Sequence, residues 1–397
     1  MARDTLIAMT RREIDNLEQG RIDLAPGILK VPTRRYFDPD RYALEVAKIF
    51  KRMPLALGFS CEMRNPGDYR AMTVSQVPVL MVRGQDGLMR AFVNMCSHRG
   101  NYVVEDGSGT AKRFRCNYHA WMYNTHGALT NVFEEKNFGC LNKSELGLTP
   151  LPCAERAGLV WVNLDPASTL DIDVFLSGYG EMLEHLRFGD AYMGGRQEID
   201  GPNWKVAYDG YRDFYHVPIL HHDTLGPEGP FQPDFYAWGP HVRVATPKGH
   251  DHFKGRAESE WTNDEMTPGV WTIFPNISIA GSPTTGYMVS QMFPGKTVGE
   301  SRTIQNFLRY GDPLQKNQTE LDQFMAFMRH VVEDEDYSTG KKVQTALATG
   351  AKEYSLFGRN EEADSCFTNG STHCWKPAMP NCRRCLTRAY PYRPSTC

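Results

Sequence analysis

The sequence predicts an α+β protein with two folded parts, one all-β and one that combines helices with an antiparallel sheet. Short apolar runs alternate with Gly-, Asp- and Asn-containing turns between Met53 and Asp165, a pattern typical of antiparallel β-structure. Apolar residues recur at helical spacing in 36–50, 203–217 and 315–347, and strand signals return at 270–309. No segment of the sequence repeats at a fixed period, which excludes solenoids and propellers.

The composition is that of an ordinary globular protein. Of the 397 residues, 41% are hydrophobic and 23% are charged, so the chain has enough apolar material to bury a large core. The 44 Lys and Arg residues nearly balance the 47 Asp and Glu residues, which argues against a nucleic-acid-binding protein. No apolar stretch approaches the roughly 18 residues that span a bilayer, and the N-terminus is charged and lacks the apolar core of a signal peptide. We therefore expect a cytoplasmic protein that binds neither nucleic acid nor membrane.

Changes in composition along the chain predict four segments. We expect a helical segment at 1–39 that packs on the α+β domain, an all-β domain at 40–165, the α+β domain at 166–366 and a tail at 367–397. Within the α+β domain, residues 224–268 are rich in Pro and Gly, which predicts long loops around a cleft.

Two short stretches of the predicted β-domain each carry one cysteine and one histidine. Cys96 and His98 form a C-x-H pair, Cys116 and His119 form a C-x2-H pair, and 17 residues separate the two pairs. Zinc fingers instead pair Cys with Cys and His with His. The spacing found here is that of a Rieske 2Fe–2S cluster, in which two cysteines hold one iron and two histidines hold the other. A Cys2His2 zinc site and chance are the alternatives.

A second group of candidate metal ligands follows in the α+β part. Asp213, His216 and His221 lie close together in the sequence, and Pro218 between the histidines would disturb a helix and re-aim His221. Two histidines and one carboxylate form the facial triad of mononuclear non-haem Fe(II) oxygenases, which leaves coordination positions for oxygen. A pair of hydrogen-bonded helix histidines is the alternative interpretation.

With both motifs, the chain resembles the catalytic α subunits of Rieske non-haem iron oxygenases, also called aromatic-ring-hydroxylating oxygenases. The resemblance runs from about Tyr36 to Glu361 and includes the NWK sequence at Asn203–Lys205. It implies a Rieske domain at 40–165 and a catalytic domain at 166–366, the latter with an antiparallel sheet of the helix-grip type.

The resemblance implies roles for the residues of the second motif. His216 and His221 would bind the mononuclear iron, and His222 is the rival of His221. Asp213 would bridge His216 to His119 of a neighbouring subunit, because the family works as a head-to-tail trimer. A carboxylate that accepts from two imidazole N–H groups fixes both tautomers and shortens the electron path.

The third iron ligand of the family is an aspartate in a late Glu-Asp pattern that ends in Gln. The segment Glu335–Gln344 matches this pattern and makes Asp336 the choice. Glu333 and Asp334 form a second Glu-Asp pair, so a shift to Asp334 stays open. An acidic run is usually a solvated helix end, and we expect that role for Glu333 and Glu335.

The activity implied by the resemblance is that of a terminal oxygenase with a 2Fe–2S cluster and a mononuclear Fe(II). Electrons from NAD(P)H would reach it through a separate reductase, with or without a ferredoxin, and O2 would be activated beside the substrate. No G-x-G-x-x-G fingerprint is found in a strand-to-helix setting, consistent with NAD(P)H binding to that partner. The implied assembly is a homotrimer, with or without a β subunit.

The substrate is left open by the sequence. An aromatic compound, most often an aromatic acid, that is hydroxylated or dihydroxylated is the family's commonest case. Oxidative N- or O-demethylation of a methylated or non-aromatic substrate is one alternative, and a plain electron-transfer or zinc-binding module is an alternative of another class. The candidate substrate-binding residues are Asp209, Phe214, Leu220 and Phe274. Asp209 also departs from the family, where many relatives carry Asn, and an ionised carboxylate there would alter the charge near the iron.

The C-terminal tail carries further thiols that the resemblance does not explain. His373, Cys374, Cys382 and Cys385 could form a small zinc site. A polar, poorly ordered tail with spare thiols is the alternative.

Overall fold

A computed structural model describes residues 2–226, 233–246, 250–315 and 317–361, so the cysteines and His373 of the tail lie outside the described residues. The chain divides into two compact units. The smaller unit consists of Ala43–Ile172 and Phe188–Tyr192, and the rest of the chain belongs to the larger unit. The return of Phe188–Tyr192 to the smaller unit has no counterpart in the domains expected from the sequence.

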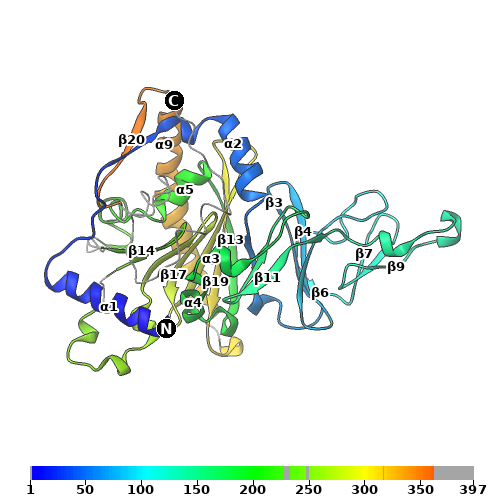
Figure 1. The fold of residues 1–397 in the computed structure, drawn as a ribbon, viewed down its shortest axis with the longest axis horizontal. Coiled ribbons are helices and arrows are strands. Elements are labelled where there is room, and N and C mark those ends of the chain that lie inside the picture. The colour runs from blue at the N-terminus through cyan, green and yellow to red at the C-terminus, as the bar shows by residue number, and fades with distance from the viewer. Residues whose placement is uncertain (1, 227–232, 247–249, 316, 362–397) are drawn as a thin grey trace. The chain divides into compact units, whose positions relative to one another are not determined.

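The smaller unit is built from three antiparallel sheets. A five-stranded sheet has the order β10-β5-β4-β3-β6, and two three-stranded sheets have the orders β11-β12-β2 and β7-β8-β9. The sheet β7-β8-β9 lies at one end of this unit (Figure 1). The strands are β2 (Leu55–Phe59), β3 (Asp68–Val74), β4 (Val77–Arg83), β5 (Met89–Val93), β6 (Gly107–Thr110), β7 (Arg113–Arg115), β8 (Met122–Asn124), β9 (Leu129–Asn131), β10 (Pro150–Leu151), β11 (Cys153–Arg156) and β12 (Leu159–Val162).

A seven-stranded sheet forms the centre of the larger unit, with the order β13-β19-β18-β17-β16-β15-β14. From β14 to β19 each strand pairs antiparallel with the next one along the chain. The strands are β13 (Tyr192–Gly201), β14 (Asp234–Trp238), β15 (His241–Ala245), β16 (Gly269–Ile273), β17 (Ile277–Ser282), β18 (Gly286–Pro294) and β19 (Ser301–Arg309). Strands β18 and β19 are almost entirely buried, so both faces of the sheet are covered at these two strands.

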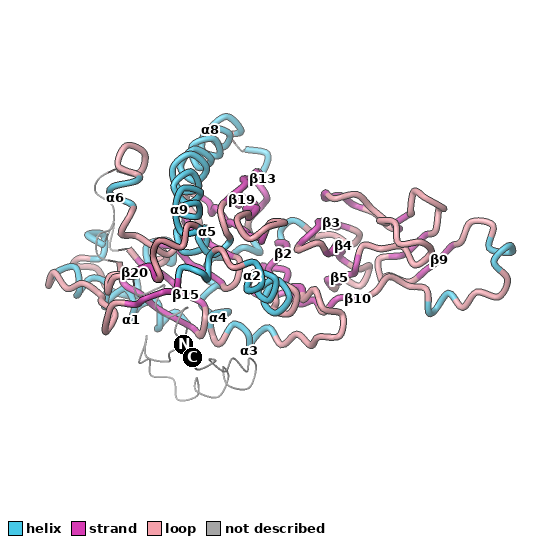
Figure 2. The backbone as a smooth tube through the Cα atoms, turned by 90° about the horizontal axis from the view of Figure 1, so that it is seen from above, coloured by secondary structure: helices cyan, strands magenta, loops and turns pink. Residues whose placement is uncertain are grey.

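Helices pack on this sheet and carry the candidate site. Helix α5 packs against β18 and β19 and also contacts α9 (Figure 1). Helices α8 and α9 follow one another along one helical course (Figure 2), joined by a π-helical segment at His330–Tyr337. The helices are α1 (Ala2–Glu18), α2 (Pro39–Glu45), α3 (Ile172–Leu176), α4 (Tyr179–Leu183), α5 (Trp204–Gly210), α6 (Val217–Leu220), α7 (Asn263–Met266), α8 (Gln318–Arg329) and α9 (Ser338–Ala348).

Among the described residues, no helix combines the length and the apolar character needed to cross a bilayer.

Two sequence expectations about secondary structure were wrong. Residues 1–39 are not one helical segment: α1 ends at Glu18, and β1 (Leu29–Pro32) pairs antiparallel with β20 (Tyr354–Phe357). Residues 224–268 are not loops alone, because β14 and β15 form a buried hairpin inside that range. Pro233 immediately precedes β14 and Pro240 lies in its turn, so both prolines avoid positions where a strand needs its N–H.

Candidate metal centres

The four residues of the first motif lie on two loops of the smaller unit with the same backbone pattern. In one loop the Gly100 N–H donates to the Cys96 carbonyl at 2.9 Å, and in the other the Ala120 N–H donates to the Cys116 carbonyl at 2.9 Å. Gly100 and Ala120 both have positive φ, at 79° and 59°, which lets each loop turn back within a few residues. Each tight loop therefore presents its cysteine and its histidine together.

The side chains of these loops fit the ligands of an iron–sulfur cluster. Cys96 and Cys116 are buried and interact with each other, and the His98 and His119 rings lie 4.4 Å apart between centroids. Nδ1 of His98 is buried and has no hydrogen-bond partner, which an imidazole ligand of iron explains. The His98 ring also stacks on Trp121, at 5.0 Å between centroids and 8° between planes, which fixes its orientation.

Hydrogen-bond donors surround the two sulfur atoms. The Tyr123 hydroxyl lies 3.3 Å from Sγ of Cys96, and the Asn101 amide lies 3.7 Å from Sγ of Cys116. Burial raises the pKa of the Cys96 thiol. Burial acts in the same direction on Cys116, but backbone N–H groups and Asn101 outweigh it and lower the pKa of that thiol. Donors of this kind stabilise thiolate ligands.

In the larger unit, His216, His221 and Asp336 bring three ligand atoms together. Nε2 of His216 lies 3.2 Å from Nε2 of His221, and Oδ1 of Asp336 lies 3.4 Å and 3.0 Å from these two nitrogens. Octahedral ligands about 2.1 Å from one ion are about 3 Å apart when they are neighbours. The three atoms thus have the mutual spacing of one face of an octahedron, and they are the group of metal-ligand type found among the described residues.

Local structure explains how these residues meet. His216 and His221 flank the four-residue helix α6, so they lie before and after one turn rather than along one helix. Pro218 lies in the first turn of α6, where proline is tolerated, and it does not break a longer helix as expected from the sequence. Asp336 lies in the π-helical segment, whose wider turn brings Glu335 to His221 as well.

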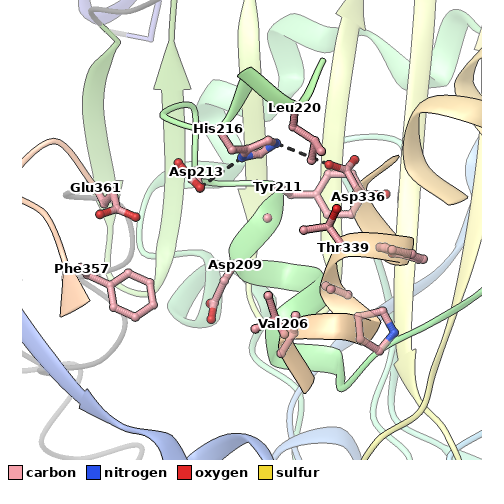
Figure 3. A pocket seen from close by; sticks show the side chains of 16 residues that line it. Val206, Asp209, Tyr211, Asp213, His216, Leu220, Asp336, Thr339, Phe357 and Glu361 are labelled. Atoms are coloured by element: carbon pink, nitrogen blue, oxygen red, sulfur yellow. Dashed lines mark hydrogen bonds and ion pairs between the residues drawn. The ribbon is translucent and has the colours of Figure 1, made fainter. Parts of the chain in front are cut away.

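Carboxylates outside the triad occupy the other nitrogen of each imidazole. Nδ1–H of His216 donates to Asp213 at 3.1 Å, and Nδ1–H of His221 donates to Glu335 at 2.6 Å (Figure 3 shows the Asp213 contact). With a cation bound, both Nε2 atoms can direct a lone pair toward it, and the cation satisfies these two atoms and the Asp336 carboxylate together. Burial lowers the pKa of an imidazole, but the hydrogen bonds to Asp213 and Asp336 outweigh it and raise the pKa of His216 to about 9.

The same geometry decides between the alternatives that the sequence left open. Asp334 pairs with His330 at 2.8 Å on the surface, and His222 pairs with Asp223 at 2.8 Å on the surface, so neither joins the triad. Glu333 pairs with Arg329 at the exposed helix face, as expected. The expectation for Glu335 was wrong, because its carboxylate accepts hydrogen bonds from His221 and from Thr224 and is not a solvated helix end.

A cavity of about 210 Å³ adjoins the triad (Figure 3). Of the four candidate substrate-binding residues, Asp209 and Leu220 line it. Phe214 instead packs against the core of β14 and β15, and Phe274 lies against Trp204 and Tyr208. The described lining residues are Pro202, Val206, Ala207, Asp209, Gly210, Tyr211, Asp213, His216, Leu220, Asp336, Tyr337, Thr339, Gly340, Val343, Phe357 and Glu361.

Asp209 does not place an unbalanced charge in the cavity. Arg212, which is fully buried, contacts its carboxylate at 2.7 Å, and the Tyr36 hydroxyl donates to it at 2.8 Å. Burial raises the pKa of Asp209, and Arg212 and Tyr36 act against that rise. This carboxylate therefore ties α5 to the N-terminal segment, and its charge is balanced by Arg212.

Phe357 and Glu361 are lining residues that the sequence did not identify. They come from β20 and the residues after it, more than a hundred residues beyond the histidines. Burial raises the pKa of Glu361, and the nearby charges of Asp213 and Asp209 raise it further. No local sequence pattern identifies these residues, because long-range contacts with the N-terminal segment, among them the pairing of β1 with β20, hold this part of the chain in place.

Family models match both units of the chain. The model described as Rieske [2Fe-2S] domain matches residues 53–144, and the model described as ring hydroxylating alpha subunit (catalytic domain) matches residues 188–369. Together these matches cover more than two thirds of the chain. The chain therefore belongs to the Rieske oxygenases, with the domain pair of their ring-hydroxylating α subunits.

Individual relatives fall into two groups. The chain is 34% identical over 202 residues to the benzene 1,2-dioxygenase subunit alpha of Pseudomonas putida, which covers 49% of this chain and 44% of that protein. The chain thus spans less than half the length of such relatives. It is 29% identical over 328 residues to the carnitine monooxygenase oxygenase subunit of Escherichia coli, which covers 80% of this chain and 84% of that protein.

Solved structures show the same fold. The quaternary ammonium Rieske monooxygenase CntA has a TM-score of 0.72 at 22% identity and covers 86% of this chain and 94% of its own. Naphthalene 1,2-dioxygenase from Rhodococcus sp. has a TM-score of 0.68 at 20% identity and covers 90% of both chains.

Proposed function

We propose that this chain is the terminal oxygenase of a multicomponent Rieske system. Cys96, His98, Cys116 and His119 would hold a 2Fe–2S cluster, and His216, His221 and Asp336 would hold a mononuclear Fe(II). When bound, the cluster supplies electrons and the iron supplies O2 activation. The observation that carries this proposal is the spacing of 3.0–3.4 Å among the three ligand atoms, with both imidazole Nδ1 atoms held by carboxylates.

The residues around the triad have separate tasks in this proposal. Glu335 and Asp213 orient the two imidazoles, and the cavity beside Asp336 holds the substrate next to the iron. Asp213, which keeps about a quarter of its side chain exposed, is the place where electrons would enter from His119 of the partner subunit in a head-to-tail trimer. A reductase, with or without a ferredoxin, would supply those electrons from NAD(P)H, and a β subunit is compatible with the assembly.

Two substrate classes follow from the relatives. Likeness to the benzene dioxygenase subunit favours hydroxylation of an aromatic ring. The carnitine monooxygenase subunit matches over a larger share of both chains, which favours oxidation at a methylated amine. An aromatic acid fits the cavity poorly, because its described lining contains four carboxylates and no Lys or Arg. We therefore propose a substrate without negative charge.

The proposal is tested by matched aspartate variants. We expect purified protein with an electron-donating reductase to consume O2 in a substrate-dependent way, and Asp336→Ala to abolish this while the visible spectrum of the cluster is kept. Asp334→Ala, two residues away and exposed, should behave like the wild type. Equal O2 consumption by the Asp336→Ala variant and the wild type would contradict the proposed iron site.

A further inference from the structure

The cavity beside the triad has an excess of negative charge. Its described lining contains Asp209, Asp213, Asp336 and Glu361, with His216 as the one residue of basic type. The charge of Asp209 is balanced by buried Arg212. The two positive charges of a bound Fe(II) would face the three remaining carboxylates, which leaves one negative charge in a partly buried space. Such a charge is costly unless a ligand balances it.

Glu361 is the carboxylate that is free to balance a ligand. Asp336 belongs to the triad and Asp213 holds His216, whereas the Glu361 carboxylate accepts a hydrogen bond from the Gly358 backbone N–H. One of its two oxygens accepts that bond. His216, the one basic residue of the described lining, would be a neutral ligand of the iron, so the charge of Glu361 would have no cationic side chain there to balance it.

An aromatic ring lines the cavity together with this carboxylate. Phe357 comes four residues before Glu361, and Figure 3 shows both on the opposite side of the view from Asp336. The face of an aromatic ring attracts cations, and most strongly cations that are poorly hydrated. A carboxylate and an aromatic ring that line the same cavity are the two elements that recognise an alkylated ammonium group.

We propose that the substrate binds as a small cation, a methylated or quaternary ammonium compound, with its charged nitrogen near Glu361 and Phe357 and its reacting carbon toward the triad. This rests on the proposed function, because it assumes that the triad holds iron. A cavity of about 210 Å³ is smaller than the pockets that hold drug-sized ligands, so the cation is small.

The test measures binding without turnover. Three probes share a tert-butyl-like shape and differ in charge: choline, 3,3-dimethylbutan-1-ol and 3,3-dimethylbutanoate. Binding to the iron-loaded holoenzyme is measured by calorimetry without O2 and without reductant, and iron content is determined on the same samples. We expect choline to bind about tenfold or more tightly than the neutral alcohol, and the carboxylate to bind least.

The Glu361→Gln variant removes the negative charge and keeps the local structure, because the amide oxygen can still accept the hydrogen bond from the Gly358 N–H. A change in cation binding can therefore be told apart from a folding defect. We expect this variant to bind choline about tenfold more weakly and the neutral alcohol unchanged. Phe357→Leu keeps apolar volume and should weaken choline binding more than alcohol binding. Glu353→Gln is the matched control, since Glu353 is exposed in the same segment and does not line the cavity.

Three results would overturn the cation proposal: equal binding of the three probes, no choline binding in the millimolar range, or a Glu361→Gln effect that is the same for choline and the alcohol. Each of these results in protein that holds its mononuclear iron leaves the oxygenase function standing. Absence of that iron from protein with an intact cluster would instead contradict the proposed function itself.

Discussion

His221 is held at both nitrogens of its ring. Glu335 accepts from Nδ1–H at 2.6 Å, Nε2 faces Asp336 at 3.0 Å, and the Thr224 hydroxyl fixes the Glu335 carboxylate at 2.8 Å. This chain of contacts selects the tautomer that a metal requires and prevents rotation of the ring. Outer partners of this kind influence metal affinity nearly as much as the ligands themselves.

Glu335→Ala should therefore weaken Fe(II) binding by about 10–100-fold, because His221 loses its orienting acceptor. The measurement is a competition between the protein and an Fe(II) chelator. Glu333→Ala is the control, since Glu333 pairs with Arg329 on the helix surface. Equal Fe(II) affinity of the two variants would show that Glu335 does not support the site.

Asp213→Asn should keep both metal centres and slow product formation by about 10–100-fold. An amide retains the shape of the carboxylate but cannot accept from two imidazoles as a charged group does. Iron content and steady-state turnover are measured on the same sample, with Asp223→Asn, at an exposed carboxylate, as the control. Near-normal turnover of Asp213→Asn would count against its bridging role.

Tyr123→Phe should make the reduction potential of the cluster about 60 mV more negative. The hydroxyl lies 3.3 Å from Sγ of Cys96, and a hydrogen bond to a charged sulfur stabilises the reduced cluster more than the oxidised one. A shift of this size equals a tenfold change for one electron. A redox titration followed by circular dichroism measures it, and Tyr69→Phe, in the same core, should leave the potential unchanged. An unchanged potential in Tyr123→Phe would contradict this role.

At the scale of elements, the π-helical segment was the feature that sequence reasoning could not foresee. The acidic run 333–336 offered several carboxylates, and regular helical spacing places them on different faces. The wider turn at His330–Tyr337 brings Glu335 and Asp336 to the same histidine. The family pattern favoured Asp336 and left Asp334 open, whereas the contact of Glu335 with His221 depends on this local departure from α-helical geometry.

The long-range pairing of β1 with β20 was likewise not predictable from the sequence. Strand β1 pairs with β20 across more than three hundred residues, and this pairing helps to hold the segment that carries Phe357 and Glu361, two residues that line the cavity. The candidate metal ligands, by contrast, lie on short motifs whose spacing is set by tight turns. Cys96 and Cys116 could therefore be identified as candidate ligands from the sequence alone. The short motifs were predictable from the sequence, whereas the residues that line the cavity, which tertiary contacts bring together, were not.

Strand β15 begins with a buried histidine that makes the larger unit sensitive to acid. Nε2–H of His241 donates to the Phe175 carbonyl at 2.9 Å, and Nδ1 accepts from the Phe274 N–H at 3.2 Å, so the ring has no room for a second proton. Burial lowers the pKa of His241 from 6.5 to about 4. Between pH 6.5 and about 4, the unfolded chain therefore binds a proton at His241 that the folded chain does not bind.

The contribution of His241 to the free energy of unfolding should accordingly be complete above pH 6.5. The free energy of unfolding should fall by about 3 kcal/mol as the pH drops from 6.5 to about 4. Urea unfolding at a series of pH values measures this, and His241→Gln should flatten that part of the profile at a lower overall stability. His126→Gln, at an exposed histidine, is the control. A profile that His241→Gln leaves as steep as in the wild type would refute the assignment.

At the scale of the whole molecule, the two candidate metal centres belong to different compact units. The cluster ligands lie within Ala43–Ile172, and the triad lies in the larger unit. The two family models match these units separately, over residues 53–144 and 188–369. Oxygenase activity requires both centres in one assembly, so their joint presence is the central claim about this protein.

The most direct test of that claim is iron and acid-labile sulfide analysis of anaerobically purified protein, with an EPR spectrum of the dithionite-reduced sample. We predict about three irons and two sulfides per chain, with the spectrum of a Rieske cluster. His216→Ala should lower the iron content to about two per chain and leave the sulfide unchanged. Zinc without sulfide, in protein shown not to have lost a cluster during purification, would contradict the account.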